Sequence, residues 1–251
     1  MNYTNENIIE RMESGENLKF LFFWGHQKSS TINKSCLSQW YESSFTVNGI
    51  EYQTAEHYMM AEKALLFNDI EIHQQIISSS KPGKVKELGR QVKGFNQRVW
   101  EENRFDIVVR GNFHKFSQNT ELSEFLKNTN GRILVEASPL DCIWGIGLAQ
   151  DNIDSGSPYL WNGLNLLGYA LMETRDVLNE IGDFKPLENP IAPPWLAYPE
   201  IERYSIGWRM GYGETHIMKL AEYFNALNES DKKVYQLTYP TFGEWKGWYD
   251  E

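Results

Sequence analysis

Glu56 and Lys63 are the residues of this sequence whose types and spacing point most directly to chemistry. They lie in the stretch EYQTAEHYMMAEKALLF, in which Thr54 is a residue type that caps helix N-termini. In a helix that begins there, Glu56 and Lys63 share one stripe at about 100° per residue. Burying an unpaired charge is costly, so an acid and an amine on a mostly buried helix are both expected to face a cleft.

The same spacing also has a simpler interpretation. Seven residues is too long a step for the usual helical ion pair, which forms at three or four. Glu56 and Lys63 could therefore emerge at the rim of the core, with the Lys63 amine reaching into water. The opposite side of the helix is apolar and predicts burial; it carries Tyr58, Ala61 and Leu65.

Short strands are expected to position this helix. The run LKFLFFWG indicates a buried strand that ends at Gly25. Two alternating runs, 45–47 and 50–52, flank Asn48-Gly49, which predicts a hairpin that leads into the Glu56 helix. The run RILVEAS predicts another strand, and the glycine-containing loop after it places Asp141 and Trp144 close together.

The middle of the chain is expected to be mainly helical. Helices are predicted near residues 69–79, 82–92, 98–116 and 120–128, separated by glycine, proline and serine breaks. A last long helix follows Gly168, with Leu167, Leu171 and Leu178 on its inner face.

Composition limits the class of protein and its compartment. The chain has 251 residues, 41% of them hydrophobic, which is ample for a folded core. We expect a cytoplasmic protein, because no apolar run approaches bilayer length and no signal-peptide core is visible. Residues 1–17 are polar and are expected to be an N-terminal tail, either frayed or a short helix.

The cysteines and histidines predict neither a metal centre nor a cofactor. Cys36 and Cys142 lack metal-site spacing and are expected to be free thiols in a reducing compartment. The five histidines form no HxxxH or HExxH pattern, so no metal is predicted.

The net charge of −10 argues against nucleic-acid binding through broad neutralisation of phosphates. A basic island nevertheless interrupts the chain, and it comprises Lys81, Lys84, Lys86, Arg90, Lys93 and Arg98. A solvated helical face is the commoner explanation of such a run. A surface that holds a phosphate is the more specific one.

Residues 183–251 are expected to be a C-terminal extension. The stretch GDFKPLENPIAPPWLAYPE carries five of the nine prolines and predicts an extended connector. A helix from about Glu214 to Leu227 and an ending rich in Trp and Tyr follow. The extension is short, so it is expected to dock on the core through Trp208, Trp245 and Trp248.

The string Thr54-Ala55-Glu56-His57-Tyr58, with Lys63 after it, resembles the signature of the YbiA-like N-glycosidases, also called the NADAR family. Further elements match in the family's order over about residues 20 to 180: Gly89-Arg90, Trp100, Arg110 with Lys115-Phe116, Leu134-Val135-Glu136, Asp141 with Trp144-Gly145-Ile146-Gly147, Gly163-x-Asn165-x-Leu167-Gly168, and Leu171-Met172-Glu173 with Arg175. The resemblance implies one mainly helical α+β domain with a few short strands, over residues 18–182.

The resemblance also implies an enzyme that cleaves the N-glycosidic bond between a ribose and a base. Known family substrates are phosphorylated ribosylaminopyrimidines of the early riboflavin pathway and ADP-ribose attached to guanine, which can belong to a nucleic acid. Lys63 would be the amine that forms a Schiff base with the ribose C1, with Glu56 and Asp141 as its acidic partners. Burial lowers the pKa of a lysine, and a nearby carboxylate can move the proton.

Other matched residues are candidates for substrate binding. Trp144 offers a stacking surface, Gly145 and Gly147 allow close backbone approach, and Asn165 can contact a ribose hydroxyl or a base edge. Each also has a structural interpretation, as a core aromatic, as tight-turn glycines and as a helix cap. For Gly168 we favour a packing role.

Arginines are the candidates for the phosphate. Arg90 and Arg110 could each hold it, because a guanidinium matches phosphate oxygens in a fork. The chain departs from the family where a Phe-x-Asn-aromatic element is replaced by Leu37-Ser38-Gln39-Trp40. The side chain that would contact the base is therefore Gln39, so the resemblance leaves the choice of substrate open.

Two other functions stay open at this point. The same fold could be a non-catalytic sensor of ADP-ribose or a nucleotide, although a binder needs no reactive amine. Alternatively, the aromatic extension could bind a protein partner, since aromatic residues anchor interfaces. The acidic net charge favours a free small substrate or a nucleotide-like adduct over nucleic acid.

Overall fold

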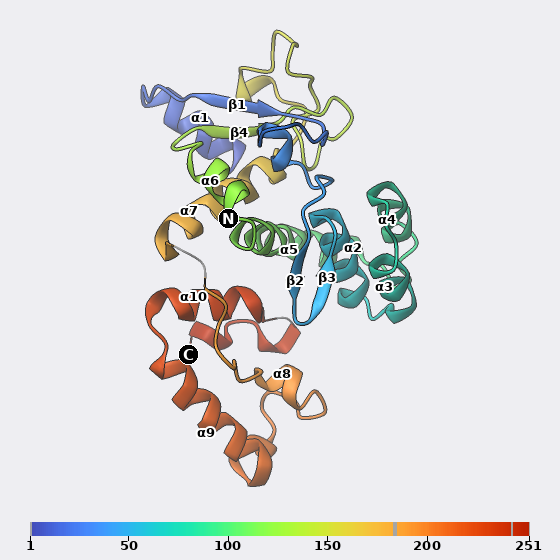
Figure 1. Ribbon diagram of the computed structural model, residues 1–251, viewed down its shortest axis with the longest axis vertical. Helices are drawn as coiled ribbons and strands as arrows, with labels where there is room; N and C mark the ends of the chain where they lie inside the picture. Colours follow the sequence, from blue (N-terminus) through green and yellow to red (C-terminus); the bar gives the residue numbers. More distant parts are fainter. Residues whose placement is uncertain (1, 183–184, 242, 251) are drawn as a thin grey trace. The chain divides into compact units, whose positions relative to one another are not determined.

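The chain forms two units, Met1–Asn179 and Glu180–Glu251. The structure is a computed structural model, and it describes residues 2–182, 185–241 and 243–250. The first unit consists of helices and a few short strands (Figure 1), namely α1 (Asn5–Glu13), β1 (Phe20–Phe23), β2 (Phe45–Val47), β3 (Ile50–Tyr52), α2 (Ala55–Leu66), α3 (Ile70–Ile77), α4 (Pro82–Gly89), α5 (Gln97–Ser117), α6 (Thr120–Lys127), β4 (Ile133–Glu136) and α7 (Leu166–Ile181), whose end falls in the second unit. The predicted mainly helical α+β class is confirmed.

Helix α2 begins where the sequence predicts. Thr54 is its N-cap, and the Thr54 side chain accepts a hydrogen bond from the His57 backbone N–H. Tyr58 packs on α5 at Gly111, where an added Cβ would lie 2.7 Å from the Tyr58 ring. Leu65 was expected on the buried side but is 37% exposed in the last turn of α2.

Two pairs of strands complete the first unit. Strands β1 and β4 pair in parallel with Phe20 opposite Ile133 and Phe23 opposite Glu136. Strands β2 and β3 form the predicted antiparallel hairpin, and both turn residues have positive φ, 50° at Asn48 and 78° at Gly49. Such a turn matches the twist of the strands, which is why Asn-Gly marks hairpins. In Figure 1 α3 and α4 lie beside α2, close to this hairpin.

The N-terminal segment forms the short helix that was one of the two alternatives for residues 1–17, and this helix is packed on the unit. Ile8 of α1 is fully buried. Asn5 ties the helix to the rest of the unit, since its side chain donates to the Gly163 carbonyl at 3.0 Å and accepts from the Tyr169 hydroxyl at 2.8 Å. Further bonds join the segment to the unit, from the Tyr3 hydroxyl to Asp176 at 2.6 Å and from the Tyr159 hydroxyl to Glu13 at 3.0 Å.

Helix α5 carries a buried lysine that supports the region before α2. Lys115 is fully buried, and its Nζ donates to the carbonyls of Cys36 and Ser38 at 2.6 and 2.8 Å. These carbonyls belong to the short 3-10 turn Lys34–Leu37 and the residue after it. Lys115 therefore fixes the chain immediately before Gln39 and Trp40.

The second unit has a hydrophobic core of its own. It contains α8 (Pro194–Ala197), α9 (Gly211–Ala226) and α10 (Glu229–Thr238). Its buried residues are aromatic and aliphatic: Trp195, Leu220, Tyr235, Tyr239 and Trp245. The three tryptophans that were expected to dock on the first unit pack in this cluster, with ring centroids 5.9 Å apart for Trp208 and Trp245 and 5.2 Å apart for Trp245 and Trp248.

The proline-rich stretch is more ordered than the predicted extended connector. Prolines fix φ and favour the first turn of a helix, and α8 begins at Pro194. Trp195 is only 5% exposed, and the Ile191 carbonyl accepts from the Tyr235 hydroxyl at 2.6 Å. The predicted domain boundary at residue 183 lies outside the described residues.

Candidate active site

Glu56 lies in the first turn of α2 and is almost fully buried, at 3% exposure. The backbone carbonyl of Gln39 accepts a hydrogen bond from the Glu56 backbone N–H at 3.0 Å. His57 stiffens the same turn, because its ring nitrogens contact the Thr54 hydroxyl at 2.8 Å and the Ser79 carbonyl at 3.0 Å. The helix N-terminus thus presents Glu56 in a fixed place.

The surroundings of Glu56 keep its carboxyl close to a protonation midpoint. Its Oε1 is buried without a hydrogen-bond partner. Burial raises the pKa of Glu56 to about 7, and repulsion from Asp141 adds to the rise. Attraction to Lys86, a hydrogen bond from Trp40 and attraction to Arg90 act in the opposite direction. A carboxyl of this kind can give or take a proton near neutral pH.

Asp141 lies in the loop after β4 and is held as a hydrogen-bond acceptor. Its Oδ1 accepts from the backbone N–H groups of Ile143 and Trp144 at 2.9 and 2.8 Å. Gly147 allows the loop to turn back with φ of 67°, and its N–H donates to the Asp141 carbonyl at 3.1 Å. The structure therefore brings Asp141 into the electrostatic environment of Glu56, as the resemblance implied.

Glu136, at the end of β4, is a third carboxyl of this site that the sequence reasoning did not assign. Its Oε2 is buried without a partner. Burial raises the pKa of Glu136 to about 8, and repulsion from Asp141 adds to the rise. The sequence feature that could have pointed to Glu136 is a charged residue directly after the apolar residues Ile133–Val135, which are fully buried in the strand.

Lys63 does not lie in this carboxyl cluster, which we define as Glu56, Glu136 and Asp141. Two turns of α2 separate Lys63 from Glu56, a rise of about 10 Å along the helix axis. The Lys63 Nζ donates to the Gly89 carbonyl at 2.8 Å and lies 4.4 Å from the Phe95 ring centroid. Partial burial lowers the pKa of Lys63 as expected, but its amine is engaged by α4.

Two cations at the end of α4 act electrostatically on Glu56. They are Lys86, in the last turn of α4, and Arg90, its C-cap residue, and both are exposed. The Lys86 Nζ lies 5.9 Å from the ring centroid of the half-buried Trp40. Arg90 was predicted from the sequence; Lys86 was noted only as part of the basic island, and Trp40 only as a departure from the family pattern.

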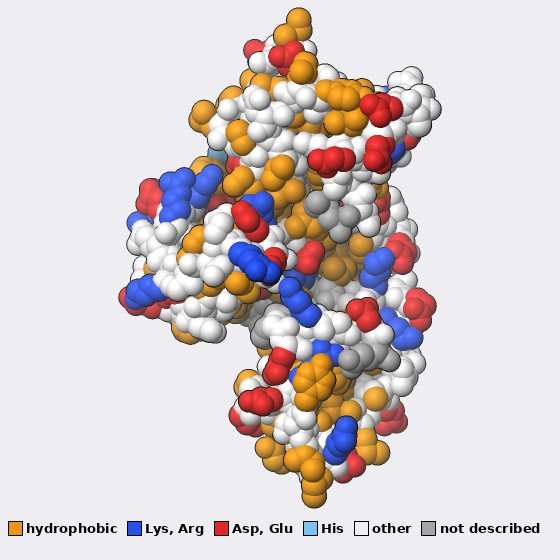
Figure 2. All heavy atoms as spheres, turned by 180° about the vertical axis from the view of Figure 1, so that it is seen from behind, with side chains coloured by type: hydrophobic (Ala, Val, Ile, Leu, Met, Phe, Trp, Pro, Cys, Tyr) orange, Lys and Arg blue, Asp and Glu red, His pale blue; other side chains and the backbone are white. Residues whose placement is uncertain are grey.

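Three of the six residues of the basic island pair with neighbouring acids. Lys84 pairs with Glu87 at 3.2 Å, Lys93 with Glu71 at 2.8 Å, and Arg98 with Glu102 at 2.9 Å. Figure 2 shows basic and acidic side chains interspersed on the face that it presents. The island is therefore mainly a solvated surface, and Lys86 and Arg90 are the part of it that approaches the carboxyl cluster.

Arg110 and Gln39 have partners within the core. Arg110 lies 3.6 Å from Glu62 and hydrogen-bonds to Tyr58, so the structure does not bring it to Glu56 or Asp141. The Gln39 side chain is buried and donates to the Asn112 side chain at 3.1 Å. Both side chains are thus used to hold α2 and the preceding loop against α5.

Asn165 is also a structural clamp. Its side chain accepts from the Glu136 backbone N–H at 3.0 Å and donates to the Leu134 carbonyl at 2.9 Å. Gly168 packs against the same strand, since an added Cβ would lie 2.1 Å from the Leu134 carbonyl oxygen, which agrees with its predicted packing role. The two residues fix β4, and with it Glu136, rather than a ligand.

The loop that carries Trp144 is shaped by its glycines. An added Cβ at Gly145 would lie 2.8 Å from the Glu136 carbonyl oxygen, and one at Gly147 would lie 2.9 Å from Cys142 Sγ. Trp144 is half-buried, and its backbone N–H donates a hydrogen bond to Asp141 Oδ1. The close approach predicted for these glycines is made to the protein's own chain.

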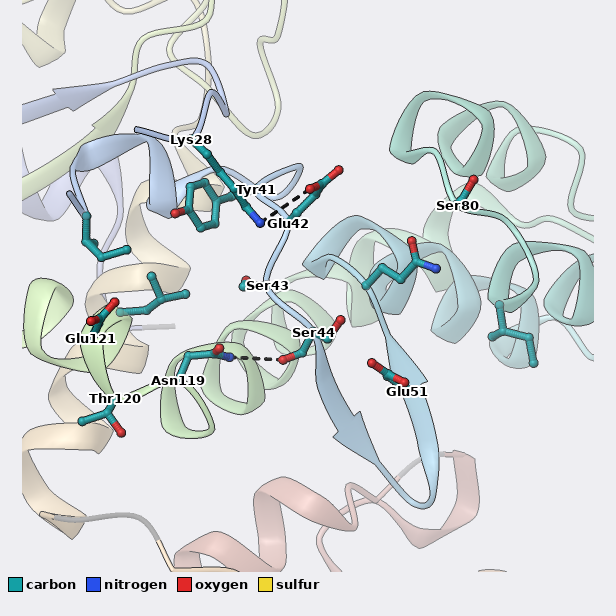
Figure 3. A pocket seen from close by; sticks show the side chains of 14 residues that line it. Lys28, Tyr41, Glu42, Ser43, Ser44, Glu51, Ser80, Asn119, Thr120 and Glu121 are labelled. Atoms are coloured by element: carbon teal, nitrogen blue, oxygen red, sulfur yellow. Dashed lines mark hydrogen bonds and ion pairs between the residues drawn. The ribbon is translucent and has the colours of Figure 1, made fainter. Parts of the chain in front are cut away.

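A wide hollow of about 1020 Å³ lies elsewhere on the first unit. Figure 3 shows Ser43 inside it, the Lys28–Glu42 ion pair at 3.5 Å, and the hydrogen bond from Asn119 to the Ser44 carbonyl. Neither the carboxyl cluster nor Lys63 lines this hollow. In the described part of the chain, no group of three His, Cys, Asp or Glu side chains could hold a metal, and both cysteines are free thiols.

Fold and site together define a class: a mainly helical α+β domain with buried carboxyls gathered beside a basic helix. Over residues 22–179 the chain matches the NADAR domain, and it belongs to that family. No helix in the described residues is both long and apolar enough to cross a membrane.

Relatives of this chain share mainly the first unit. It is 44% identical over 163 residues to an N-glycosidase of Acanthamoeba polyphaga mimivirus, covering 63% of this chain and 95% of that protein. It is 34% identical over 131 residues to the chloroplastic riboflavin biosynthesis protein PYRR of Zea mays, covering 49% of this chain and 19% of that protein. The NMR structure of the E. coli protein YbiA matches with a TM-score of 0.53 and 25% identity, covering 68% of this chain and 91% of that one.

Proposed function

We propose that this protein is an N-glycosidase that cleaves the bond between a phosphorylated ribose and an amino-heterocycle. The observation that carries the proposal is Glu56, buried at a helix N-terminus with an unpartnered oxygen and a pKa raised to about 7 beside Asp141 and Lys86. Relatives named as N-glycosidases support the reaction class. Burial of an acid in this state costs stability, and catalysis is a physical reason to retain it.

Carboxyls suit this reaction for two reasons. The ribose becomes cationic as the bond to the base breaks, and an ionised carboxylate stabilises that charge. The leaving base must also gain a proton, which a carboxyl with a pKa near neutrality can provide. Asp141 accepts two backbone N–H groups, which fix the direction of its carboxylate, so it takes the first role in this proposal.

The phosphate of the substrate would bind Lys86 of α4 and Arg90, the residue that follows α4. Both are exposed cations near Glu56, and the described residues give neither of them an ion pair. Their position one helical turn apart lets both reach a single phosphate. Trp40 lies beside Lys86 and offers a flat surface for the ribose or the base.

The proposal also includes a more specific step, in which a lysine amine attacks the ribose C1. The family resemblance implies a Schiff base on Lys63, whose lowered pKa favours the neutral amine. Attack on a ribose held by Glu56 and Asp141 would require the Lys63 amine to leave the Gly89 carbonyl and cross about two helical turns. Lys86 is the amine that lies beside Glu56, so both lysines belong in the test.

Two substrate classes fit the chemistry. One is a phosphorylated ribosylaminopyrimidine of riboflavin synthesis, in line with the name of the maize relative. The other is ADP-ribose attached to guanine, free or in nucleic acid. The net charge of −10 and the ion pairs of the basic island favour a small substrate over a long nucleic acid.

A sensor that binds ADP-ribose or a nucleotide without cleaving it is the second candidate. The observation that favours it is the position of Lys63, whose amine is engaged away from the carboxyl cluster. A sensor, however, gains nothing from two buried carboxyls with unpartnered oxygens.

The test is borohydride trapping of the intact protein with ribose 5-phosphate or ADP-ribose, followed by mass spectrometry. Lys63→Ala and Lys86→Ala are compared with Lys84→Ala, an exposed lysine of α4 that is paired with Glu87. Loss of the sugar adduct in one of the first two variants identifies the amine. Turnover without any adduct removes the Schiff base, and tight binding with neither adduct nor turnover favours the sensor.

A further inference from the structure

Glu136 is held by its backbone on three sides. Strand β4 pairs it with Phe23 of β1, its N–H donates to the Asn165 side chain at 3.0 Å, and its carbonyl accepts from the Ile146 N–H at 3.0 Å. Gly145 lies against it closely enough that an added Cβ would be 3.2 Å from Glu136 Cγ. These contacts fix the backbone of Glu136, and the glycine leaves room for its side chain.

The Glu136 carboxyl makes no hydrogen bond or ion pair that would stabilise the fold. Oε2 is buried without a hydrogen-bond partner, and no hydrogen bond or ion pair to the side chain of Glu136 is found among the described residues. A structural carboxyl in such a place would be expected to hold a cap, a turn or a cation, because an unmatched buried polar group costs free energy. Glu136 has the properties of a group kept for a ligand.

Glu56 and Glu136 both lie near Asp141 but have opposite surroundings. Glu56 receives a hydrogen bond from Trp40 and the attraction of Lys86 and Arg90, which favour its ionised form. The charge acting on Glu136 is the negative one of Asp141, while Phe23, Gly145 and Asn165 bring no charge to it. The pKa of Glu136 is therefore raised with no cation to oppose the rise, which makes Glu136 better suited than Glu56 to hold a proton.

We propose that Glu136 is the catalytic acid that protonates the leaving heterocycle, an inference that rests on the N-glycosidase function proposed above. As the C1–N bond breaks, its electron pair goes to the heterocycle nitrogen, which takes the proton of Glu136. The nucleophile, which is water or the lysine amine of the proposed Schiff base, then adds to C1, and the proton that it loses restores the Glu136 carboxyl. The Asp141 carboxylate stabilises the cationic ribose.

The experiment compares Glu136→Gln and Glu136→Asp with the wild type on a phosphorylated ribosylaminopyrimidine, measuring kcat from pH 5 to pH 10. The wild type should lose activity as pH rises through about 8, where Glu136 gives up its proton. Glu136→Gln should lower kcat by about 100-fold or more and remove that limb of the profile. Glu136→Asp should restore part of the rate together with a basic limb.

A second substrate separates proton donation from structure. A 4-nitrophenyl riboside 5-phosphate has a leaving group that needs no proton, so Glu136→Gln should cleave it at close to the wild-type rate. Glu71→Gln, which changes an exposed carboxylate of α3, is the matched control. Equal loss on both substrates with a lowered melting temperature would mean a structural role and overturn the proposal.

Different results would overturn the proposed N-glycosidase function and the proposed role of Glu136. Absence of turnover by the wild type on every ribosyl substrate would overturn the proposed function, and the role of Glu136 with it. Wild-type turnover, with Glu136→Gln keeping both its rate and its basic limb, would overturn the role of Glu136 alone.

Discussion

At the scale of single residues, this protein retains ionisable groups in places where ionisation is disfavoured. Glu136 is the strongest case, because burial and the charge of Asp141 both raise its pKa. The unfolded state gives up this proton near pH 4.5, whereas the native state holds it up to about pH 8. Between these values the native state binds more protons than the unfolded state, so stability falls as pH rises.

Glu136→Gln should therefore make the protein less sensitive to alkali. The wild type should lose roughly 1.4 kcal/mol per pH unit through this group across that window, and the variant should not. Urea unfolding at pH 5, 7 and 9 measures the difference. A variant whose free energy of unfolding keeps the full wild-type pH dependence would show that Glu136 is ionised in the native state.

Lys115 makes stability depend on pH in the opposite direction from Glu136. Burial lowers its pKa to about 7, so between pH 7 and its usual value the unfolded state binds more protons and stability rises with pH. Lys115→Met would leave the Cys36 and Ser38 carbonyls without this donor, at a cost of about 1–3 kcal/mol. Thermal and urea unfolding should show this loss, whereas the exposed Lys19→Met should change little.

The family resemblance implied that Glu56 and Asp141 act as acidic partners, and the structure brings the two into one electrostatic environment, while their catalytic roles stay predictions. Residue types gave less information about the other candidates. They did not reveal what Asn165 and Arg110 contact. An asparagine or arginine has the same hydrogen-bonding groups whether it meets a ligand or a strand, and only the fold decides that Asn165 clamps β4. The site roles of Trp144 and Arg90 stay predictions.

At the scale of elements, the site depends on how closely β4 approaches α7. Gly168→Ala would place a Cβ 2.1 Å from the Leu134 carbonyl oxygen, and a backbone atom cannot give way as a flexible side chain can. We expect a loss of about 1–3 kcal/mol in the free energy of unfolding. Gly156→Ala is the control, because its Cβ would meet no atom within 4 Å. Equal stability of the two variants would contradict the packing seen here.

Elements with strong local signals were predictable. The Asn-Gly hairpin and the Thr54 cap are confirmed because a two-residue turn and an N-cap depend on residues a few positions apart. The packing of α1 and α10 was not foreseen, since each helix is mostly polar and contributes few buried side chains. For α1 the buried side chain is Ile8, and for α10 they are Val234 and Tyr235.

At the scale of the whole molecule, the NADAR domain and the second unit have separate cores. The match to the family ends at residue 179, and the aromatic cluster of the second unit lies beyond it. The sequence predicted the boundary region from its prolines but not the independent core, because its Trp and Tyr residues fit an interface and a core equally well.

Trp245→Ala should loosen the second unit alone. Trp245 is 5% exposed and contacts Trp195, Trp208 and Trp248. Its removal should cost about 3–5 kcal/mol in that unit and split or broaden the thermal transition. Turnover should persist, because every candidate site residue lies in the first unit. Tyr204→Ala, at an 80% exposed position, should leave the transition unchanged, and loss of turnover in Trp245→Ala would contradict the independence of the two cores.

The central claim is that the carboxyl cluster cleaves an N-glycosidic bond, and the most direct measurement is release of free base from a phosphorylated ribosyl substrate by wild type, Glu56→Gln and Glu71→Gln. The account predicts release by the wild type, a loss of about 100-fold or more in Glu56→Gln, and no change in Glu71→Gln. Undiminished release by a folded Glu56→Gln would contradict it.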